Sequence, residues 1–245
     1  MRRVLFVLVL ACAFAAPVHS QPAPGLALRW NHCFGEGTGV QLRSFACNTN
    51  AGAEQLVGSF ALFNAVPDAT GSDIVIDIIT GYPFPSGSLP AWWMFRNDGT
   101  CRLSALSVSF EAEDTNVTCQ DWGGGVQVGL IGAYLIDQPF PGRARLTIST
   151  ALPADRPKSL TSGVEYYSFT LRISHVKTVG AGACGGCDVP MTVFFRSLNV
   201  TATNPANGNH IAGPLNGQES DIAIWSPLPV PTEAATWGAL KRMYR

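Results

Sequence analysis

The chain has 245 residues, 16 of them basic and 17 acidic, and charged residues make up 13% of the total, about half the usual share. So small a net charge, −1 at neutral pH, gives no reason to expect nucleic acid or an anionic membrane as the partner. The length suits one ordinary β domain with short terminal segments.

Residues 1–20 have the three parts of an export signal. Arg2 and Arg3 supply a positive start, residues 4–16 are an unbroken apolar run, and residues 18–20 form a small-x-small cleavage site. The 13 apolar residues are too few to span a bilayer, which takes about 20. We therefore predict that residues 1–20 are removed and that the mature protein is secreted or held at the cell surface.

A lipoprotein signal is the alternative interpretation of this leader. Residues 9–12, Val-Leu-Ala-Cys, resemble a bacterial lipobox, in which the cysteine (Cys12) is lipidated and becomes the new N-terminus. Leu10 fits its position poorly and the apolar run continues past Cys12, so cleavage near Ser20 is favoured. That cleavage leaves 14 basic and 17 acidic residues, a net charge of −3.

Alternation of apolar and polar residues, enriched in β-branched and aromatic types, recurs along the rest of the chain. In residues 165–176, for example, Tyr167, Phe169 and Leu171 would share one face, with polar residues between them. Clusters of Gly, Pro, Asn and Asp separate the segments. The predicted strands are residues 26–30, 40–45, 55–63, 73–80, 92–95, 103–110, 126–136, 144–150, 165–176, 191–201 and 221–225.

This pattern predicts one all-β domain over residues 21–226, an antiparallel β-sandwich of the jelly-roll or immunoglobulin-like kind. No segment before residue 230 has a sustained period of 3.6 residues, so no long helix is expected there. The same stretch has no internal repeat and no linker, which indicates a single domain.

Six cysteines remain after removal of the leader, and an even number in an exported chain is typical of disulfide bonds. Several connectivities are compatible with the sequence. We expect three local bridges that brace the sandwich, because the members of each pair lie in one segment of the chain. The expected pairs are Cys33–Cys47, Cys101–Cys119 and Cys184–Cys187.

The segment Cys184-Gly-Gly-Cys187 has the spacing of a redox-active dithiol or of half a zinc site. A redox pair needs a helix N-terminus to activate a thiol, and here the pair lies in a glycine-rich turn before a strand. A zinc site needs two further ligands, and the chain has no second C-x-x-C segment. A structural disulfide is therefore favoured, and no metal or other cofactor is predicted.

Residues 227–245 differ from the rest of the chain. Three prolines form a stiff spacer, and a short amphipathic helix is predicted after it, with Trp237, Leu240 and Tyr244 along one face. Such a short helix is marginal alone and must dock on something. We predict that the secretion machinery or a surface partner recognises this tail; the alternative is that the tail packs against its own sandwich.

Three segments together resemble a group of uncharacterised secreted bacterial proteins rich in β structure. The resemblance covers most of the mature chain and implies export from a bacterium. It implies no activity and no functional residues, because none is established for that group. The segments are residues 182–190 (Gly-Ala-Cys-Gly-Gly-Cys-Asp-Val-Pro), residues 89–93 (Leu-Pro-Ala-Trp-Trp) leading to Cys101, and the tail with Trp237, Gly238, Lys241, Tyr244 and Arg245.

An aromatic segment, residues 82–95, is the candidate ligand-binding surface. Tyr82, Trp92 and Trp93 lie in it among prolines and glycines, and flat rings on a sandwich surface can stack on sugars. Because Trp92 and Trp93 are adjacent, in a strand they would point to opposite faces, one into the core and one to solvent. The alternative is that these rings all fill the core, as aromatic residues commonly do.

Carboxylates and histidines offer weaker candidates. Glu111 and Glu113 would share a strand face, as would Asp73 and Asp77, and paired carboxylates can hydrolyse glycosides or bind calcium. Solvated strand faces explain these acids more simply. His210 is the best candidate for the base of a triad built from distant residues, since no G-x-S-x-G, H-E-x-x-H or P-loop motif is present.

The low charge, the few histidines and the lack of a catalytic motif favour a non-enzymatic structural or adhesive β-sandwich module that is secreted or held at the cell surface. Two alternatives stay open: a carbohydrate-binding module that uses the aromatic segment, and a secreted hydrolase. The expected partner is a glycan or another surface or secretion protein rather than a nucleic acid. No segment after the leader is apolar for long enough to cross a membrane as a helix.

Overall fold

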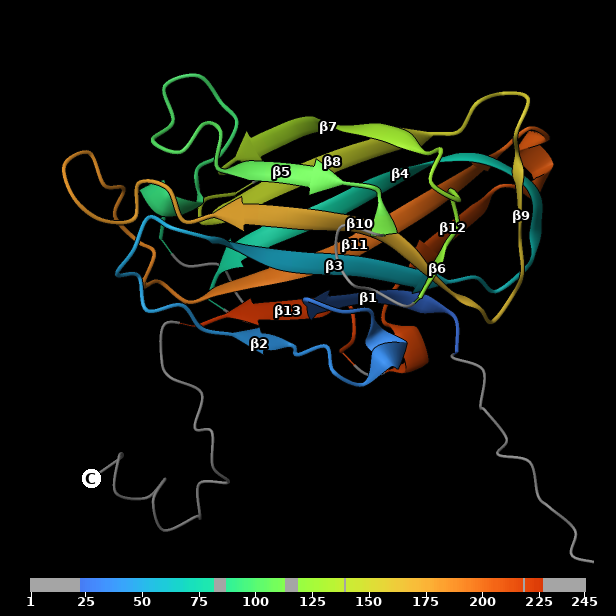
Figure 1. The fold of residues 1–245 in the computed structure, drawn as a ribbon, viewed down its shortest axis with the longest axis horizontal. Helices are drawn as coiled ribbons and strands as arrows, with labels where there is room; N and C mark the ends of the chain where they lie inside the picture. Colours follow the sequence, from blue (N-terminus) through green and yellow to red (C-terminus); the bar gives the residue numbers. More distant parts are fainter. Residues whose placement is uncertain (1–22, 82–86, 113–118, 139, 218, 227–245) are drawn as a thin grey trace, which may run out of the picture.

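The computed structural model describes residues 23–81, 87–112, 119–138, 140–217 and 219–226 (Figure 1). Strands make up 49% of the structure, and none of its described helices reaches seven residues, so the predicted all-β class is confirmed. No helix among the described residues is long and apolar enough to span a membrane. The predicted leader at residues 1–20 and the predicted tail at residues 227–245 lie outside the described residues.

The strands form two sheets that stack as a sandwich, with the five-stranded sheet in front in Figure 1. Its order is β1-β3-β10-β5, and its strands are β1 (Gly25–Trp30), β3 (Ala53–Ala61), β5 (Leu106–Ser109), β10 (Glu165–Ser174) and β6 (Gln120–Asp121), which pairs with β10. The eight-stranded sheet has the order β2-β13-β11-β4-β8-β7. Its strands are β2 (Leu42–Arg43), β4 (Val66–Thr80), β7 (Val128–Ile136), β8 (Arg143–Ala151), β11 (Met191–Ala202) and β13 (Ile222–Trp225), with β9 (Lys158–Leu160) beside β4 and β12 (Asn209–Ala212) beside β11.

Pairing between these strands is antiparallel, except for the short parallel pairs β6–β10 and β2–β13. The loops contain short 3₁₀ turns rather than α-helices. Those that the structure describes are η1 (Phe34–Glu36), η2 (Ala91–Trp93), η4 (Pro205–Asn207) and η5 (Leu215–Gly217).

Strand β4 shows how the sequence divides between core and surface. Ile74, Ile76 and Ile78 point into the space between the sheets and are at most 1% exposed. The residues between them, Val75 and Asp77, and Asp73 just before them therefore face the outer side of the eight-stranded sheet. Burying one isoleucine side chain contributes about 2 kcal/mol. A slip of one residue would expose all three isoleucines, so the register of β4 is strongly determined.

The tryptophan pair corrects a sequence prediction. Residues 91–93 form η2 rather than part of a strand, and the turn follows Pro90, which cannot donate a hydrogen bond to a ladder. Successive residues of a 3₁₀ turn point about 120° apart, not to opposite faces. Trp92 and Trp93 therefore both enter the core, where their rings pack against Trp225 with centroids 5.3 and 5.4 Å away.

Other strand boundaries differ where the local sequence is polar or short. β4 begins at Val66, seven residues before the predicted start, although Asp68 and Gly71 are poor strand formers. The predicted strand at residues 40–45 is reduced to Leu42–Arg43. The short strands β6, β9 and β12 are absent from the predicted set, because each is formed by pairing with a longer strand rather than by its own pattern.

All six cysteines among the described residues form disulfides, but the predicted local pairing is wrong. The strands that meet in a sandwich come from distant parts of the chain, so cysteines that are close in sequence need not meet. In the chain-entropy model, bridges that close loops of this length contribute about 4–5 kcal/mol each. The observed pairs are Cys33–Cys119, Cys47–Cys187 and Cys101–Cys184, with sequence separations of 86, 140 and 83 residues.

Candidate functional site

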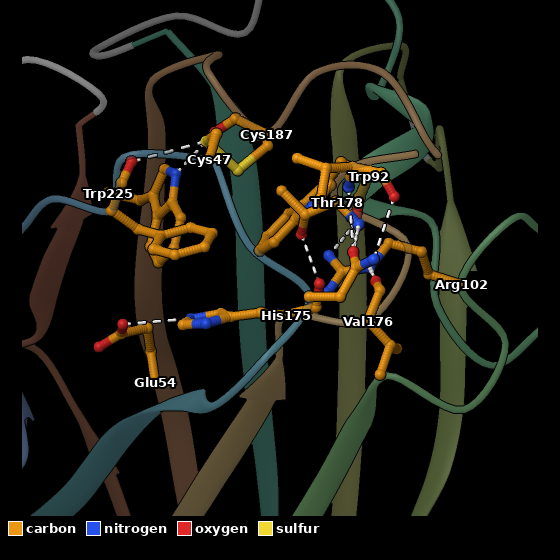
Figure 2. Close-up of a disulfide and its surroundings, with 12 residues drawn as sticks. Cys47, Glu54, Trp92, Arg102, His175, Val176, Thr178, Cys187 and Trp225 are labelled. Atoms are coloured by element: carbon orange, nitrogen blue, oxygen red, sulfur yellow. Dashed lines mark hydrogen bonds and ion pairs between the residues drawn. A yellow bond between two sulfur atoms is a disulfide. The ribbon is translucent and has the colours of Figure 1, made fainter. Parts of the chain in front are cut away.

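The sugar-stacking surface predicted at the two tryptophans is not present. Trp92 and Trp93 are each 0% exposed, so neither ring offers a face to a ligand. Trp92 donates from Nε1 to Thr178 Oγ1 at 3.0 Å, and the Arg102 guanidinium lies 3.4 Å above its ring (Figure 2). Tyr82, the third predicted binding residue, lies outside the described residues. The core alternative is therefore correct for the tryptophans.

Arg102 is buried, forms no ion pair with an acid in the part of the chain that the structure describes, and acts as a structural clamp. It donates hydrogen bonds to the backbone carbonyls of Trp92 at 2.6 Å, of Val176 at 3.1 Å and of Ser174 (Figure 2). Burial lowers the pKa of Arg102 to about 9, a cost that these three carbonyls and the Trp92 ring offset. The side chain thus holds η2 against the chain that follows β10.

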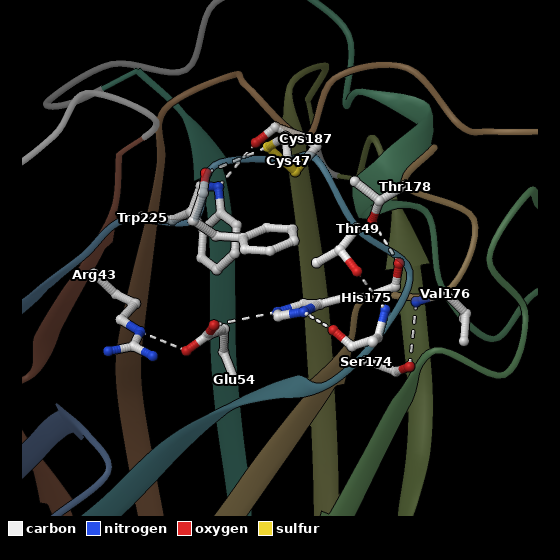
Figure 3. A network of polar contacts seen from close by, with 12 residues as sticks. Arg43, Cys47, Thr49, Glu54, Ser174, His175, Val176, Thr178, Cys187 and Trp225 are labelled. Carbon is white, nitrogen blue, oxygen red and sulfur yellow. Dashed lines mark hydrogen bonds and ion pairs between the residues drawn. A yellow bond between two sulfur atoms is a disulfide. The ribbon is translucent and has the colours of Figure 1, made fainter. Parts of the chain in front are cut away.

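A second buried network surrounds His175 at the same end of the sandwich (Figure 3). Nδ1 lies 2.7 Å from the Ala51 carbonyl and so carries a hydrogen, because a carbonyl can only accept. Nε2 lies 3.2 Å from Glu54 Oε1, but the angle between the two groups is unsuitable for a hydrogen bond. Arg43 donates a hydrogen bond to the same Glu54 carboxylate. Phe45 stacks on the imidazole at 3.7 Å. The ring is enclosed, which suits a structural role rather than proton exchange with a substrate.

The other candidates from the sequence do not converge. His210 is exposed and lines a shallow pocket of about 460 Å³ with Asn199 and Thr201, and the pocket's described lining includes no carboxylate to orient an imidazole. Glu111 is exposed beside the end of β5, and Glu113 lies outside the described residues. Asp73 is exposed and accepts a hydrogen bond from Ser149 Oγ at 2.7 Å.

The six described cysteines are all joined in disulfides, so their sulfurs are not thiolate ligands. Cys184 and Cys187 bond to different partners, so the C-x-x-C segment forms neither a dithiol nor half a zinc site. The described residues bring Cys33, Glu36 and Cys119 within metal-ligand distance of one another, but both sulfurs belong to one disulfide. A disulfide sulfur lacks the thiolate charge that zinc requires.

The most unusual group of side chains surrounds Asp77, which was expected on a solvated strand face and is instead 1% exposed. Arg143 Nη2 donates to its Oδ2 at 2.5 Å, and Arg145 donates to Oδ1 at 2.9 Å and to Oδ2 at 3.1 Å. Arg196 Nε donates to Oδ2 at 2.9 Å. We name these four residues the arginine cluster; it joins β4, β8 and β11 on the outer face of the eight-stranded sheet.

A β-bulge places the third arginine. In the pairing of β11 with β4, Phe194 lies opposite Asp77, but the register shifts between Phe195 and Ser197, which leaves Arg196 as an extra residue. Bulges re-aim side chains and are enriched next to functional sites. The Arg196 guanidinium lies 4.2 Å above the Phe194 ring, which holds it over the sheet and beside Asp77.

Charge in the arginine cluster is unbalanced. Three guanidinium groups surround one carboxylate, an excess of two positive charges. Asp221 lies close enough to attract Arg196 as well as Arg29; burial raises the pKa of Asp221, and both arginines lower it. The Arg143 side chain is 8% exposed, and its Nε has no hydrogen-bond partner among the described residues, which is rare for a buried donor.

The two other arginines remain accessible at the surface. The side chains of Arg145 and Arg196 are 37% and 45% exposed. Phe140, 44% exposed, has its ring centroid 5.0 Å from the Arg143 guanidinium, and Leu135, 40% exposed, is the cross-strand partner of Arg145. Outward-facing donors beside apolar side chains could hold an anionic group next to an apolar surface.

No model of a known protein family matches the chain, and no curated protein is similar to it in sequence. The function is therefore inferred from the side chains of the chain itself. Sequence reasoning missed the arginine cluster because its members lie far apart in the chain and Arg196 depends on a bulge. The available signal was Asp77, an aspartate with isoleucines on both sides in β4, together with arginines at the alternate positions 143 and 145 of β8.

Proposed function

We propose that the protein is an exported, non-enzymatic β-sandwich module that attaches to an anionic ligand through the arginine cluster. Three disulfides are typical of proteins that fold in an oxidising compartment, which supports export. The observation that carries the proposal is the excess of positive charge that three arginines hold around the buried Asp77. The adhesive role expected from the sequence thereby acquires a contact surface.

The geometry supports a ligand better than it supports an internal clamp. One or two arginines would satisfy Asp77, whereas a third adds repulsion between like charges. Asp77 binds Arg145 through Nε and Nη2, and binds Arg196 through Nε, so both guanidinium groups are fixed while other N–H donors remain. Fixed, partly exposed guanidinium groups recognise carboxylates, sulfates and phosphates by paired hydrogen bonds.

The test is binding of the mature chain to dextran sulfate and polygalacturonate, with neutral dextran as the reference. We expect binding to both anionic polymers that weakens as salt rises, because accessible charges are screened. Arg145→Gln and Arg196→Gln should each weaken binding about 10- to 150-fold, the equivalent of a charged hydrogen bond of about 1.5–3 kcal/mol. Asp77 keeps at least two arginines in either variant, so the fold should persist.

The matched control is Arg156→Gln, which removes the same charge from a side chain that is 65% exposed and lies beyond the end of β8, outside the cluster. It should bind like the wild type. If neither anionic polymer binds at low salt, or if the cluster variants bind as well as Arg156→Gln does, the proposed function is wrong. Circular dichroism of each variant establishes that the loss is not caused by unfolding.

A further inference from the structure

We propose that the ligand is an acidic glycan that lies along the outer face of the eight-stranded sheet, with a carboxylate at the arginine cluster and its hydroxyl groups over the polar residues beyond it. This inference rests on the proposed anion-binding function and adds the class of ligand and its direction on the sheet. It replaces the sugar site predicted at the tryptophans with a different surface.

Strand register places a strip of polar side chains on the same face as Asp77. Thr147 and Ser197 both lie opposite Val75, which is the next outward-facing residue of β4 after Asp77 in the direction of Asp73. The next row of outward-facing residues passes through Asp73 and contains two uncharged hydrogen-bonding side chains, one acid and one histidine. It runs across four strands in the order Ser149, Asp73, Asn199 and His210.

The strip leads from the arginine cluster to the pocket at β12. Asp77 and Asp73 are four residues apart in β4, which corresponds to about 14 Å along the strand. Beyond Asp73 the strip reaches Asn199 and His210, which line the shallow pocket with Thr201. A ligand that touches both ends must therefore be a short oligomer rather than a single small anion.

The chemistry of this face suits a sugar chain. Three polar groups of the strip can each donate and accept hydrogen bonds, as a sugar hydroxyl does. These groups are the hydroxyls of Ser149 and Thr147 and the amide of Asn199. Phe140 and Leu135 add exposed apolar surface beside the arginines, against which the apolar face of a sugar ring can pack.

Negative charges at the far end argue against a nucleic acid or an anionic membrane as the ligand. Asp73 is exposed within the strip, and Asp68 lies near the pocket, where it accepts hydrogen bonds from the Asn204 amide and from Asn207. The bond from the Asn204 amide, followed by that from Asn207, lowers the pKa of Asp68, so it is charged at neutral pH. A nucleic acid or an anionic membrane would meet repulsion here. An oligogalacturonide carries one carboxylate on each sugar, with neutral hydroxyls between the carboxylates, so it can place hydroxyls rather than a carboxylate at Asp73.

The experiment is calorimetric titration of the mature chain with galacturonate and with oligogalacturonides of increasing length. Methyl-esterified oligomers, which keep the sugar chain and lose the charge, are the ligand control. We expect affinity to rise at least tenfold between the monosaccharide and oligomers that span about 14 Å, and no binding of the esters. The variant Asn199→Ala/His210→Ala should lose the gain with length and keep monosaccharide binding.

Ser107→Ala, an exposed serine on the five-stranded sheet, is the matched control and should bind every oligomer like the wild type. Affinity that is independent of length, or unaffected by Asn199→Ala/His210→Ala, would overturn the glycan proposal while leaving anion binding intact. Tighter binding to phosphatidylglycerol vesicles or to single-stranded DNA would overturn it in favour of another polyanion. Failure of galacturonate, oligogalacturonides and dextran sulfate alike would instead refute the proposed function.

Discussion

Replacing Asp77 with asparagine tests the electrostatic interpretation of the arginine cluster directly. The substitution keeps the shape of the side chain and removes its charge, so three guanidinium groups lose their shared counter-ion. Arg145 and Arg196 can turn toward water because more than a third of each side chain is exposed. Arg143 has no such escape, since its side chain is 8% exposed.

The size of the effect follows from this burial. Removing one partner of a buried ion pair costs about 3–5 kcal/mol, because the other charge stays buried. In a domain of this size, 1 kcal/mol shifts the Tm by about 2–4 °C. Asp77→Asn should therefore lower the Tm by about 6–20 °C. Arg145→Gln should cost only about 0–1 kcal/mol, because it removes a partly exposed partner and leaves Asp77 paired.

The assay is thermal and urea unfolding of both variants, followed by circular dichroism. Asp73→Asn is the matched control, since it neutralises an exposed aspartate on the same face of the same strand. That control should change stability by less than about 0.5 kcal/mol. Equal losses for Asp77→Asn and Arg145→Gln, or a loss below about 1 kcal/mol for Asp77→Asn, would refute the claim that Asp77 holds the cluster together.

Three further predictions follow from other parts of the fold. Non-reducing peptide mapping should recover Cys101 linked to Cys184, and no peptide with an internal bond between residues 184 and 187. Arg102→Met should abolish folding or lower the stability by more than about 3 kcal/mol, because three buried carbonyls lose their donor; pulse proteolysis measures this. Burial raises the pKa of Asp221 above its ordinary 3.8, so the folded state favours the protonated carboxyl. The resulting contribution to stability is complete below pH 3.8 and is lost as the pH rises through the pKa of Asp221 in the folded protein. Asp221→Asn should accordingly raise the Tm at neutral pH and leave it unchanged in acid.

Local alternation was sufficient to predict the fold class but not its exceptions. β10 matches the predicted bounds closely, and Phe169 and Leu171 face the core as expected. A bulge between Tyr167 and Phe169 breaks the alternation, however, so Tyr167 does not share their face and packs with Cys33 and Val57 in a separate cluster. The tryptophan pair was misplaced because a 3₁₀ turn and a strand orient adjacent side chains differently, and two tryptophans do not distinguish them. The disulfide pairing depends on which strands become neighbours, which is a property of topology and not of spacing.

The candidate site was less predictable for a related reason. Asp77 and Arg145 are opposite each other only because β4 and β8 pair in one register, across 68 residues of sequence. Arg196 reaches them only through the bulge, which ordinary alternation does not reveal. Phe194 and Phe195 signal the irregularity in retrospect, since two bulky apolar residues in a row interrupt the period of the strand.

Position 77 would be apolar if stability alone had determined it. Its outward-facing neighbours in β4 are Val75 and Ile79, and replacing buried ion pairs by well-packed apolar residues is often neutral or stabilising by about 1–4 kcal/mol. The chain instead keeps three guanidinium groups, a bulge and a buried Arg143 Nε to which no described residue offers a hydrogen bond. An anion bound at these groups would relieve their mutual repulsion, so ligand and native fold would stabilise each other. This is expected of a surface that is completed by its ligand, and a purely structural clamp would have no need of the excess charge.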